Sequence, residues 1–310
     1  MAIIINSIFP IIILLVTGNL LRRYQFLSPE FWRGSEKLVY YILFPALLIH
    51  KISQVDLAHF PLFRMLSFLW ILFAILSLLA FFIYKISHSQ AFQFSSIYQA
   101  VTRFNSYIYF AIVAEFWGNS GLAIASVLTG LIVPTVNILC VASFSVNGDK
   151  FSFKKTLLSI GKNPLFLACI TGFIINILPF NLPIFILGSL DIFARASLPL
   201  ALLAVGAAVQ VKSLYKIHIG FTPYPIWLAA ITRLFVAPFI CFMLAKLMGL
   251  SPEITYSFTL AFAVPTATSA YILSKQLGGD AEMMATHISL QTLLSPISLF
   301  FWLSLFSFLG

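Results

Sequence analysis

Charged residues are scarce in this chain, and acidic residues are the scarcest of them. Only 9% of the 310 residues are charged and nine are Asp or Glu, while 61% are hydrophobic. Soluble domains carry roughly 25% charged residues, so this composition excludes an ordinary soluble fold. The apolar residues recur in stretches of about 20, which is long enough for a helix to cross a hydrocarbon core of about 30 Å.

Reactive cysteines and catalytic motifs are also missing. Cys140, Cys169 and Cys241 all lie in apolar stretches without CxxC spacing, which predicts buried and inert thiols. The chain has no HExxH or GxSxG motif and no cluster of His with Asp, which argues against a membrane-embedded enzyme. Neither a cofactor nor a metal site is therefore expected.

The apolar stretches predict an all-α polytopic membrane protein with ten transmembrane helices. They lie near residues 3–21, 36–53, 61–84, 94–116, 120–144, 164–180, 184–209, 224–248, 255–275 and 283–308. The connection 145–163 is the longest and is basic. We interpret it as a cytoplasmic linker between a first half, 1–144, and a second half, 164–310.

The net charge of +9 follows from membrane topology and does not indicate nucleic-acid binding. When the connections are assigned alternately to two sides, the basic residues divide very unequally. Lys51, Arg64 and Lys246 fall on one side, and twelve fall on the other: Arg22, Arg23, Arg33, Lys37, Lys85, Lys150, Lys154, Lys155, Lys162, Lys212, Lys216 and Lys275. The basic side is predicted to be cytoplasmic, which places both termini outside the inner membrane. No basic region precedes the first apolar run, so a cleaved signal peptide is not expected.

The two halves of the sequence repeat each other. An offset of 154 residues aligns Pro45 with Pro199, and an offset of 160 aligns Asn105 with Pro265 and Gly118 with Gly278. Because each half holds five spans, the second copy must be inverted in the bilayer. Interrupted helices at matching positions of inverted repeats point to a transporter's binding site. Spans four and nine are therefore predicted to be broken.

Polar residues gather in the middle of these two spans. Span four carries Gln99, Thr102, Arg103, Asn105, Ser106, Tyr107 and Tyr109, and span nine carries Pro265, Thr266, Thr268, Ser269 and Tyr271. Polar groups are costly in hydrocarbon, so such clusters usually face a cavity or the bundle interior. Pro265 also frees a carbonyl four residues earlier, and freed carbonyls and half-helix N-termini can bind ions. The alternative is a proline kink whose backbone groups bond to neighbouring Thr and Ser.

Two arginines lie within predicted spans, whereas no acidic residue lies in the middle of one. A guanidinium without a fixed carboxylate partner can bind a carboxylate that arrives and leaves, because its planar fork matches that group. Arg103 and Arg233 are therefore candidates for an anion site. Snorkelling is the competing interpretation for both arginines, in the case of Arg233 toward the cytoplasmic interface. Asp191 and Arg195, four residues apart, are interpreted as a local helix pair.

The scarcity of acids also bears on ion coupling. Proton antiporters commonly use a buried Asp or Glu, and none is available here. His287 in span ten could titrate near neutral pH, or it could be a hydrogen-bonded structural residue. A sodium site built from carbonyls, Asn, Ser and Thr is a further option, so proton and sodium both stay open as coupling ions.

Eight short motifs span nearly the whole chain in order. They are Leu43–Leu48 (LFPALL), Arg103–Asn105, Trp117–Leu122 (WGNSGL), Val133–Asn137 (VPTVN), Ser197–Val209, Arg233–Pro238 (RLFVAP), Val264–Gly279 and Thr292–Leu303. Together they make the chain resemble bacterial members of the auxin efflux carrier family, within the bile-acid and arsenite transporter superfamily.

The resemblance implies two inverted five-helix repeats, with helices four and nine broken and crossing near the midplane. It also implies an elevator-like cycle, in which a transport domain of spans 3–5 and 8–10 slides against a scaffold of spans 1, 2, 6 and 7. The scaffold is often a homodimer contact. Family substrates include auxin and, in bacteria, dicarboxylates such as malate and malonate.

The predicted function is secondary active transport of small organic anions such as carboxylates, by efflux. The predicted substrate-binding residues are Arg103, Asn105, Ser106, Asn137, Arg233, Pro265, Thr266 and Thr268. Relatives usually have a small residue after the asparagine of span four, whereas Ser106 and Tyr107 follow here, so Tyr107 and Tyr109 are expected to narrow the pocket or change the substrate. The alternatives are a sodium-coupled symporter of the bile-acid type and a passive anion channel.

Overall fold

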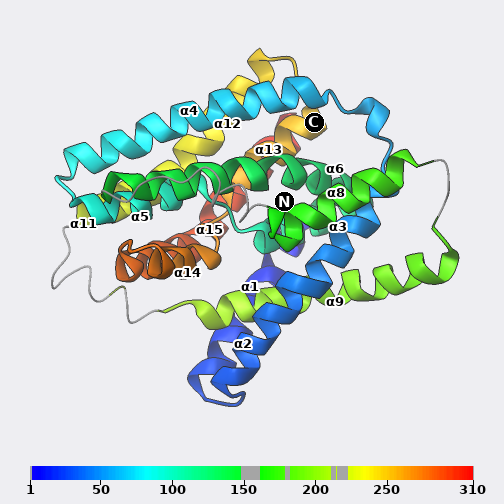
Figure 1. Cartoon of the computed structure of the whole chain (residues 1–310), viewed down its shortest axis with the longest axis horizontal. Helices are drawn as coiled ribbons and strands as arrows, with labels where there is room; N and C mark the ends of the chain where they lie inside the picture. Colours follow the sequence, from blue (N-terminus) through cyan, green and yellow to red (C-terminus); the bar gives the residue numbers. More distant parts are fainter. Residues whose placement is uncertain (1, 148–160, 179–181, 211–213, 215–222, 310) are drawn as a thin grey trace.

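Every regular element in the described part of the chain is helical (Figure 1). The computed structural model describes residues 2–147, 161–178, 182–210, 214 and 223–309, so most of the linker 145–163 and several of its lysines lie outside it. Six helical stretches are long and apolar enough to cross a membrane: Ile4–Arg23, Leu62–Ile86, Ala91–Val146, Ile184–Ala208, Pro223–Leu247 and Ala281–Leu309. This supports the predicted all-α polytopic membrane protein, while the arrangement of ten spans as inverted repeats stays a prediction.

The other predicted spans correspond to shorter or merged helices. Span 36–53 consists of α2 (Pro29–Leu38), a π-helical turn η1 (Val39–Leu43) and α3 (Phe44–Ile52), and span 164–180 contains α8 (Pro164–Ile177). Spans 94–116 and 120–144 are α5 (Ala91–Thr102) and α6 (Ser106–Ser143), where Gly118 kinks α6 with φ 61° and ψ −142°. Span 255–275 is divided into α13 (Pro252–Ala263) and α14 (Ser269–Gln276).

A first group of helices is held by close backbone contacts. Helix α1 (Ala2–Arg23) packs on α9 (Ile184–Ala208), and α3 packs on both α8 and α9. A Cβ added at Gly18 would clash with the Leu203 carbonyl, and one added at Gly206 would clash with the Leu15 carbonyl. Small residues at such a crossing allow two membrane helices to approach closely.

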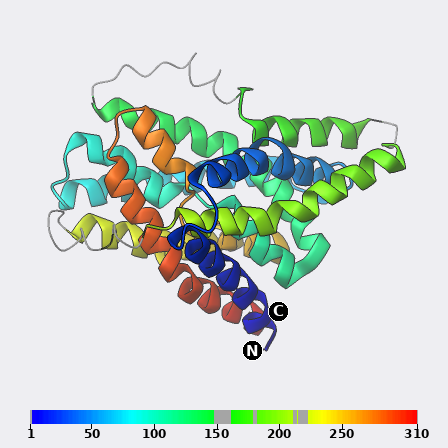
Figure 2. The same ribbon diagram turned by 90° about the horizontal axis from the view of Figure 1, so that it is seen from below.

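A second group surrounds the two helix interruptions. Helix α4 (Leu62–Ile86) packs on α5, and α12 (Ala237–Leu247) packs on α13. Helices α11 (Pro223–Ile231) and α15 (Ala281–Leu309) pack against α5. Figures 1 and 2 show α14 and α15 beside α5 on the side of the molecule away from α8. Short 3-10 turns, η2 (Leu57–His59) and η3 (Phe144–Asn147), lie at helix ends.

A proline shapes the helix that carries Arg233. The π-helical turn η5 (Thr232–Val236) directly precedes Pro238, which has no N–H to offer the carbonyl of Leu234. That carbonyl instead accepts hydrogen bonds from Ser298 Oγ (2.6 Å) and Trp302 Nε1 (3.4 Å) of α15. The result is a helix fixed to α15, with Arg233 fully buried.

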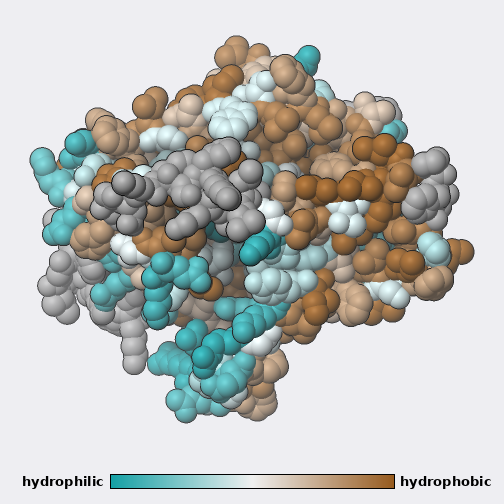
Figure 3. Space-filling model, in the orientation of Figure 1, coloured by the Kyte–Doolittle hydropathy of each residue, from teal (hydrophilic) through white to brown (hydrophobic). Residues whose placement is uncertain are grey.

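The surface agrees with a protein that lies in lipid. Figure 3 shows hydrophobic residues over most of this face, with a hydrophilic patch over α2 at the lower end. Exposed Arg33 and Glu30 form an ion pair of 2.9 Å on α2. Such exposed pairs contribute little to stability, and here they mark a segment in contact with water.

Candidate substrate-binding site

The two helix interruptions meet in the interior of the molecule. Helix α5 ends at Thr102 and α6 begins at Ser106, while α13 ends at Ala263 and α14 begins at Ser269. The backbone N–H of Asn105 donates a hydrogen bond of 2.8 Å to the carbonyl of Pro265. Four helix ends therefore lie around one backbone contact between the two interruptions, which we call the crossover (residues 103–105 and 264–268).

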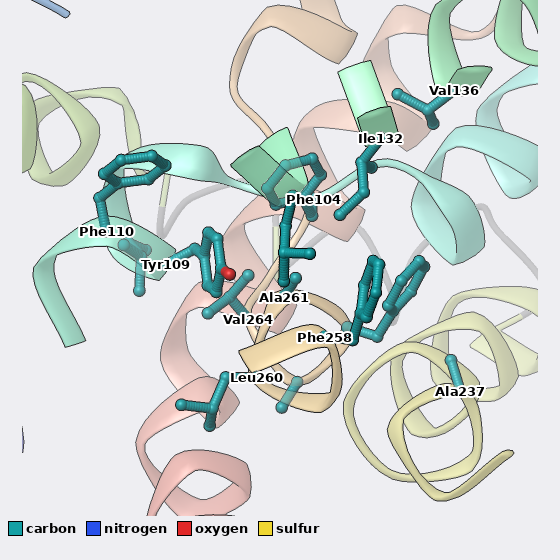
Figure 4. Packing of buried hydrophobic residues seen from close by; sticks show 14 of the residues in the cluster. Phe104, Tyr109, Phe110, Ile132, Val136, Ala237, Phe258, Leu260, Ala261 and Val264 are labelled. Carbon is teal, nitrogen blue, oxygen red and sulfur yellow. The ribbon is translucent and has the colours of Figure 1, made fainter. Parts of the chain in front are cut away.

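The backbone of the first interruption is extended, so successive side chains point to opposite sides. Arg103 (φ −84°, ψ 136°) and Asn105 (φ −84°, ψ 97°) are both extended, so their side chains point away from that of Phe104. Phe104 packs into the apolar core near Ile132, Ala261 and the Tyr109 ring (Figure 4). Arg103 and Asn105 are thereby directed to the opposite side.

Asn105 caps α6 with one end of its side chain and leaves the other end unbonded. Its Oδ1 accepts hydrogen bonds from the backbone N–H groups of Tyr107 (3.1 Å) and Ile108 (3.2 Å), as an N-cap residue does. Its Nδ2 is buried and has no hydrogen-bond partner among the described residues. Leaving a buried donor unpaired costs about 1–3 kcal/mol, so this amide is ready to donate to a ligand.

The second interruption is, by contrast, bonded within the protein at Pro265 and Thr266. Pro265 and Thr266 are buried, and the N–H of Thr266 donates to Gln291 Oε1 at 2.9 Å. Thr266 Oγ1 and Gln291 Nε2 both donate to the carbonyl of Ala100 at 3.0 Å. These bonds connect the second interruption to α5 and α15, and they use the N–H and the hydroxyl of Thr266.

Arg233 binds the backbone of both interruptions. Its Nε donates to the Val264 carbonyl at 2.9 Å and its Nη2 to the Ala261 carbonyl at 2.6 Å. Its Nη1 reaches the carbonyls of Val101 (3.3 Å) and Thr102 (3.5 Å). Since the side chain is fully buried, the snorkelling interpretation is wrong. Every guanidinium nitrogen already donates to a backbone carbonyl, so Arg233 stabilises the backbone of the crossover.

Arg103 is the less constrained of the two arginines. It is half-buried, its Nη1 makes a long contact of 3.5 Å with Gln99 Oε1, and its guanidinium also bonds the Cys140 thiol. Among the described residues the ion pairs involve other side chains, so Arg103 has no carboxylate partner there. It lies near Tyr40 of η1 and Cys140 of α6. A guanidinium in this setting is available to an anion.

The remaining candidates lie around the same point and are less enclosed. Ser106 and Thr268 are half-buried at the starts of α6 and α14, and Asn137 is half-buried on α6. Asn137 is one turn from Cys140, whose Sγ contacts Thr102 Oγ1 at 3.7 Å. All three thus lie close to the first interruption or to the start of the second half-helix.

Tyr107 and Tyr109 make contacts with different helices. Tyr109 is fully buried, and its hydroxyl lies 2.7 Å from Ser257 Oγ on α13, so it connects the two broken helices. Tyr107 is half-buried, and its ring packs edge-on against Phe44 of α3 at 5.0 Å. Tyr107, two residues after Asn105, is therefore the less enclosed of the two.

The helix ends give the crossover an uneven electrostatic character. The C-termini of α5 and α13 carry partial negative charge, and Arg233 compensates them through their own carbonyls. The N-termini of α6 and α14 carry partial positive charge, to which Arg103 adds a full one. The electrostatic surroundings of Asn105 therefore favour a negative charge.

Other candidate groups lie outside this arrangement. His287 is fully buried, and neither ring nitrogen has a partner among the described residues, so it is not the hydrogen-bonded residue considered from the sequence. The three cysteines are buried and free, as predicted. Asp191 and Arg195 form the predicted local pair at 2.6 Å. The described residues hold no metal-binding cluster of His, Cys, Asp or Glu.

Sequence reasoning missed Gln291 and misjudged the contacts of Arg233. Gln291 is a fully buried amide in an apolar helix, and that polarity was a usable signal. The freed carbonyl expected four residues before Pro265 is that of Ala261, and Arg233 occupies it. No spacing rule links residue 233 to that carbonyl, because the contact depends on how α13 packs against η5.

Comparison with known proteins also indicates a membrane transporter. Residues 3–303 match the family described as membrane transport protein, which is that of the auxin efflux carriers. A 135-residue stretch is 26% identical to sodium/bile acid cotransporter 5 of Rattus norvegicus, and it covers 42% of this chain and 31% of the rat protein. The shared stretch thus spans less than a third of that relative. Because the family match extends over nearly the whole sequence, the chain belongs to the membrane transport protein family of auxin efflux carriers.

Proposed function

We propose that this protein is a secondary active carrier of small organic anions, chiefly carboxylates, and that the anion binds beside the first interruption. The observation that carries this proposal is the buried, unpartnered Nδ2 of Asn105. In this proposal Arg103 supplies the charge, and the half-buried Ser106, Asn137 and Thr268 contribute further polar groups. Pro265, Thr266 and Arg233 hold the crossover in shape. An anion placed there accepts from an amide and a guanidinium at once.

The inverted repeat of ten spans is supported by two matching side chains. Asn19 Nδ2 donates to the carbonyls of Gly206 (3.2 Å) and Val209 (3.0 Å). Asn176 Nδ2 donates to the carbonyls of Ile52 (2.9 Å) and Val55 (2.7 Å). Each acceptor in the first set follows its counterpart by 154 residues, the offset that aligns Pro45 with Pro199.

The packing of the helices also supports a division into two moving parts. The proposed scaffold contains α1, α3, α8 and α9, which pack on one another. The proposed transport domain contains α4, α5, α6 and α11 to α15, and it carries the crossover. In an elevator-like cycle this domain slides against the scaffold with the anion bound. Efflux from the cytoplasm, an inner-membrane location with both termini outside, and a scaffold homodimer complete the proposal.

A sodium-coupled symporter is the second candidate, because the rat relative is named as a sodium/bile acid cotransporter. That name applies to the relative, and the shared stretch covers a minor part of it. A passive anion channel is the third candidate. Saturable counter-transport of malonate in proteoliposomes would support the carrier, and ohmic anion conductance would rule it out.

The site is tested by thermal unfolding of the purified protein with mono- and dicarboxylates, with sodium present and absent. We expect malonate or a related carboxylate to raise the Tm of the wild type. Asn105→Asp keeps the helix-capping oxygen but replaces the amide donor with a negative charge, so it should abolish the response. Asn105→Ala should abolish it too, with an added loss of about 1 kcal/mol from the missing cap.

The matched control is Asn163→Asp. Asn163 caps α8 in the same way, with Oδ1 accepting from Leu165 N (2.9 Å) and Phe166 N (3.3 Å), and it lies away from the crossover. This variant should keep the wild-type response. If no carboxylate stabilises the wild type more than Asn105→Asp, the proposed site is wrong.

A further inference from the structure

The carbonyl oxygens around Arg233 form an arrangement that would suit a cation. Four of these oxygens lie at the C-terminal ends of α5 and α13, on Val101, Thr102, Ala261 and Val264. In addition, the Phe262 ring faces the guanidinium at 5.2 Å from its centroid. Carbonyl oxygens at the C-terminal ends of broken helices are the groups with which transporters coordinate sodium.

Here a side chain of the protein fills that arrangement. The guanidinium donates from Nε, Nη1 and Nη2, so each nitrogen serves at least one carbonyl. A guanidinium keeps its charge under all ordinary conditions and is held covalently, unlike an ion that must bind and leave. The negative ends of the two half-helices are therefore compensated in every step of the cycle.

We infer that Arg233 is a resident cation, which takes the place that a coupling sodium ion would occupy at these carbonyls and makes anion transport independent of sodium. The inference rests on the proposed function of the crossover as the anion site. It assigns different jobs to the two arginines: Arg233 stabilises the crossover permanently, and Arg103 meets the anion. It also removes the main physical reason for a sodium-coupled mechanism at this place.

The first test compares sodium with choline at equal ionic strength. The wild type should show the same Tm in both salts without carboxylate, and the same rate of malonate counterflow in proteoliposomes. A sodium-specific rise in Tm, or a counterflow rate at least fivefold higher in sodium, overturns the inference. The proposed function is tested separately by the malonate response in choline alone, so either can fail without the other.

The second test separates charge from hydrogen bonding. Arg233→Lys keeps the charge and Arg233→Gln removes it, while both have fewer N–H donors than the guanidinium. We expect Arg233→Lys to retain most of the wild-type Tm and counterflow, and Arg233→Gln to lose both in choline. Sodium should partly restore the Tm of Arg233→Gln, which a purely structural role would not produce. Arg195→Gln, which removes an exposed arginine from the Asp191 pair, serves as the control and should resemble the wild type.

Three results count against the inference. They are a wild-type Tm and rate in Arg233→Gln, equal losses in Arg233→Gln and Arg233→Lys, or a Tm of Arg233→Gln that sodium and choline affect alike. If Arg233→Gln fails to fold in choline, its yield on purification in sodium is compared instead, and an increase of at least threefold is expected. An unchanged yield overturns the inference.

Discussion

The two interruptions of the crossover occupy corresponding places in the sequence but have opposite characters. In the second, the N–H and the hydroxyl of Thr266 are bonded within the protein, through Gln291 and the carbonyl of Ala100. In the first, Asn105 keeps an unpartnered amide and Arg103 has no carboxylate partner among the described residues. One copy of the repeat serves as a support, and the other presents free donors.

The difference shows how a repeated sequence can separate stability from binding. A fully bonded interruption can be buried without penalty, because each backbone group freed by the break finds a partner. An interruption with free donors is stable only if its surroundings are held rigidly by other contacts. Here Arg233 and Gln291 provide those contacts from the second half of the chain.

Among the variants that test this difference, Gln291→Leu should lower the free energy of unfolding most. The variant leaves the Thr266 N–H unbonded and takes one donor from the Ala100 carbonyl, at about 1–3 kcal/mol for each buried group left unpaired. We expect the free energy of unfolding to fall by about 2–4 kcal/mol, measured by thermal or denaturant unfolding in detergent. Gln54→Leu, at the exposed end of α3, should change it by less than about 1 kcal/mol. Equal losses in both would show that the second interruption is not the support.

Arg103→Gln should weaken anion binding with little loss of stability. The side chain is half-buried and its polar contacts are weak, with Gln99 Oε1 at 3.5 Å and with the Cys140 thiol, so little stabilisation is removed. A charge-assisted pair is worth about 1.5–3 kcal/mol, which corresponds to at least a tenfold loss in malonate affinity. Isothermal titration should detect this loss. Arg64→Gln is the control, because Arg64 bonds the Gly249 carbonyl far from the crossover. An unchanged affinity in Arg103→Gln would remove Arg103 from the site.

Tyr109→Phe tests the direct connection between the two broken helices. The hydroxyl pairs with Ser257 Oγ in a fully buried setting, so its loss should cost about 1 kcal/mol in the free energy of unfolding. Tyr98→Phe removes a similar contact with Ser77 between α4 and α5 and should cost a similar amount. Only Tyr109→Phe should show coupling with Ser257→Ala in a double-mutant cycle. Strict additivity there would mean that the contact does not hold the helices together.

Much of the fold could be predicted from the sequence, because scarce charge and long apolar stretches leave few alternatives in a membrane. The interruptions were also predictable, since Pro265 and the polar cluster around Asn105 mark them. The contacts of Arg233 were not. The position of Arg233 in a span is compatible with snorkelling or with ligand binding, and its actual contacts depend on packing between segments about 30 to 130 residues apart in sequence. Residues bonded to the backbone of a distant helix leave no local pattern.

Substitution of Tyr107 should have the smallest effect, a change in which carboxylate is preferred. The offset of 160 residues that aligns Asn105 with Pro265 places Tyr107 opposite Ala267, so the interruption with free donors carries the larger side chain. Its ring packs against Phe44 of α3, at the boundary between the proposed transport domain and scaffold. Tyr107→Ala should therefore enlarge the space beside Asn105 and favour longer carboxylates.

We expect the ratio of affinities for a six-carbon dicarboxylate and malonate to rise about two- to fivefold in Tyr107→Ala, which is less than about 1 kcal/mol. Tyr107→Phe keeps the ring and should leave the ratio unchanged. Tyr41→Ala, which removes an exposed tyrosine from η1, is the control for general destabilisation. If Tyr107→Ala lowers both affinities equally, Tyr107 shapes the helix start rather than the substrate space. The size limit of the carrier would then have to come from the scaffold side alone.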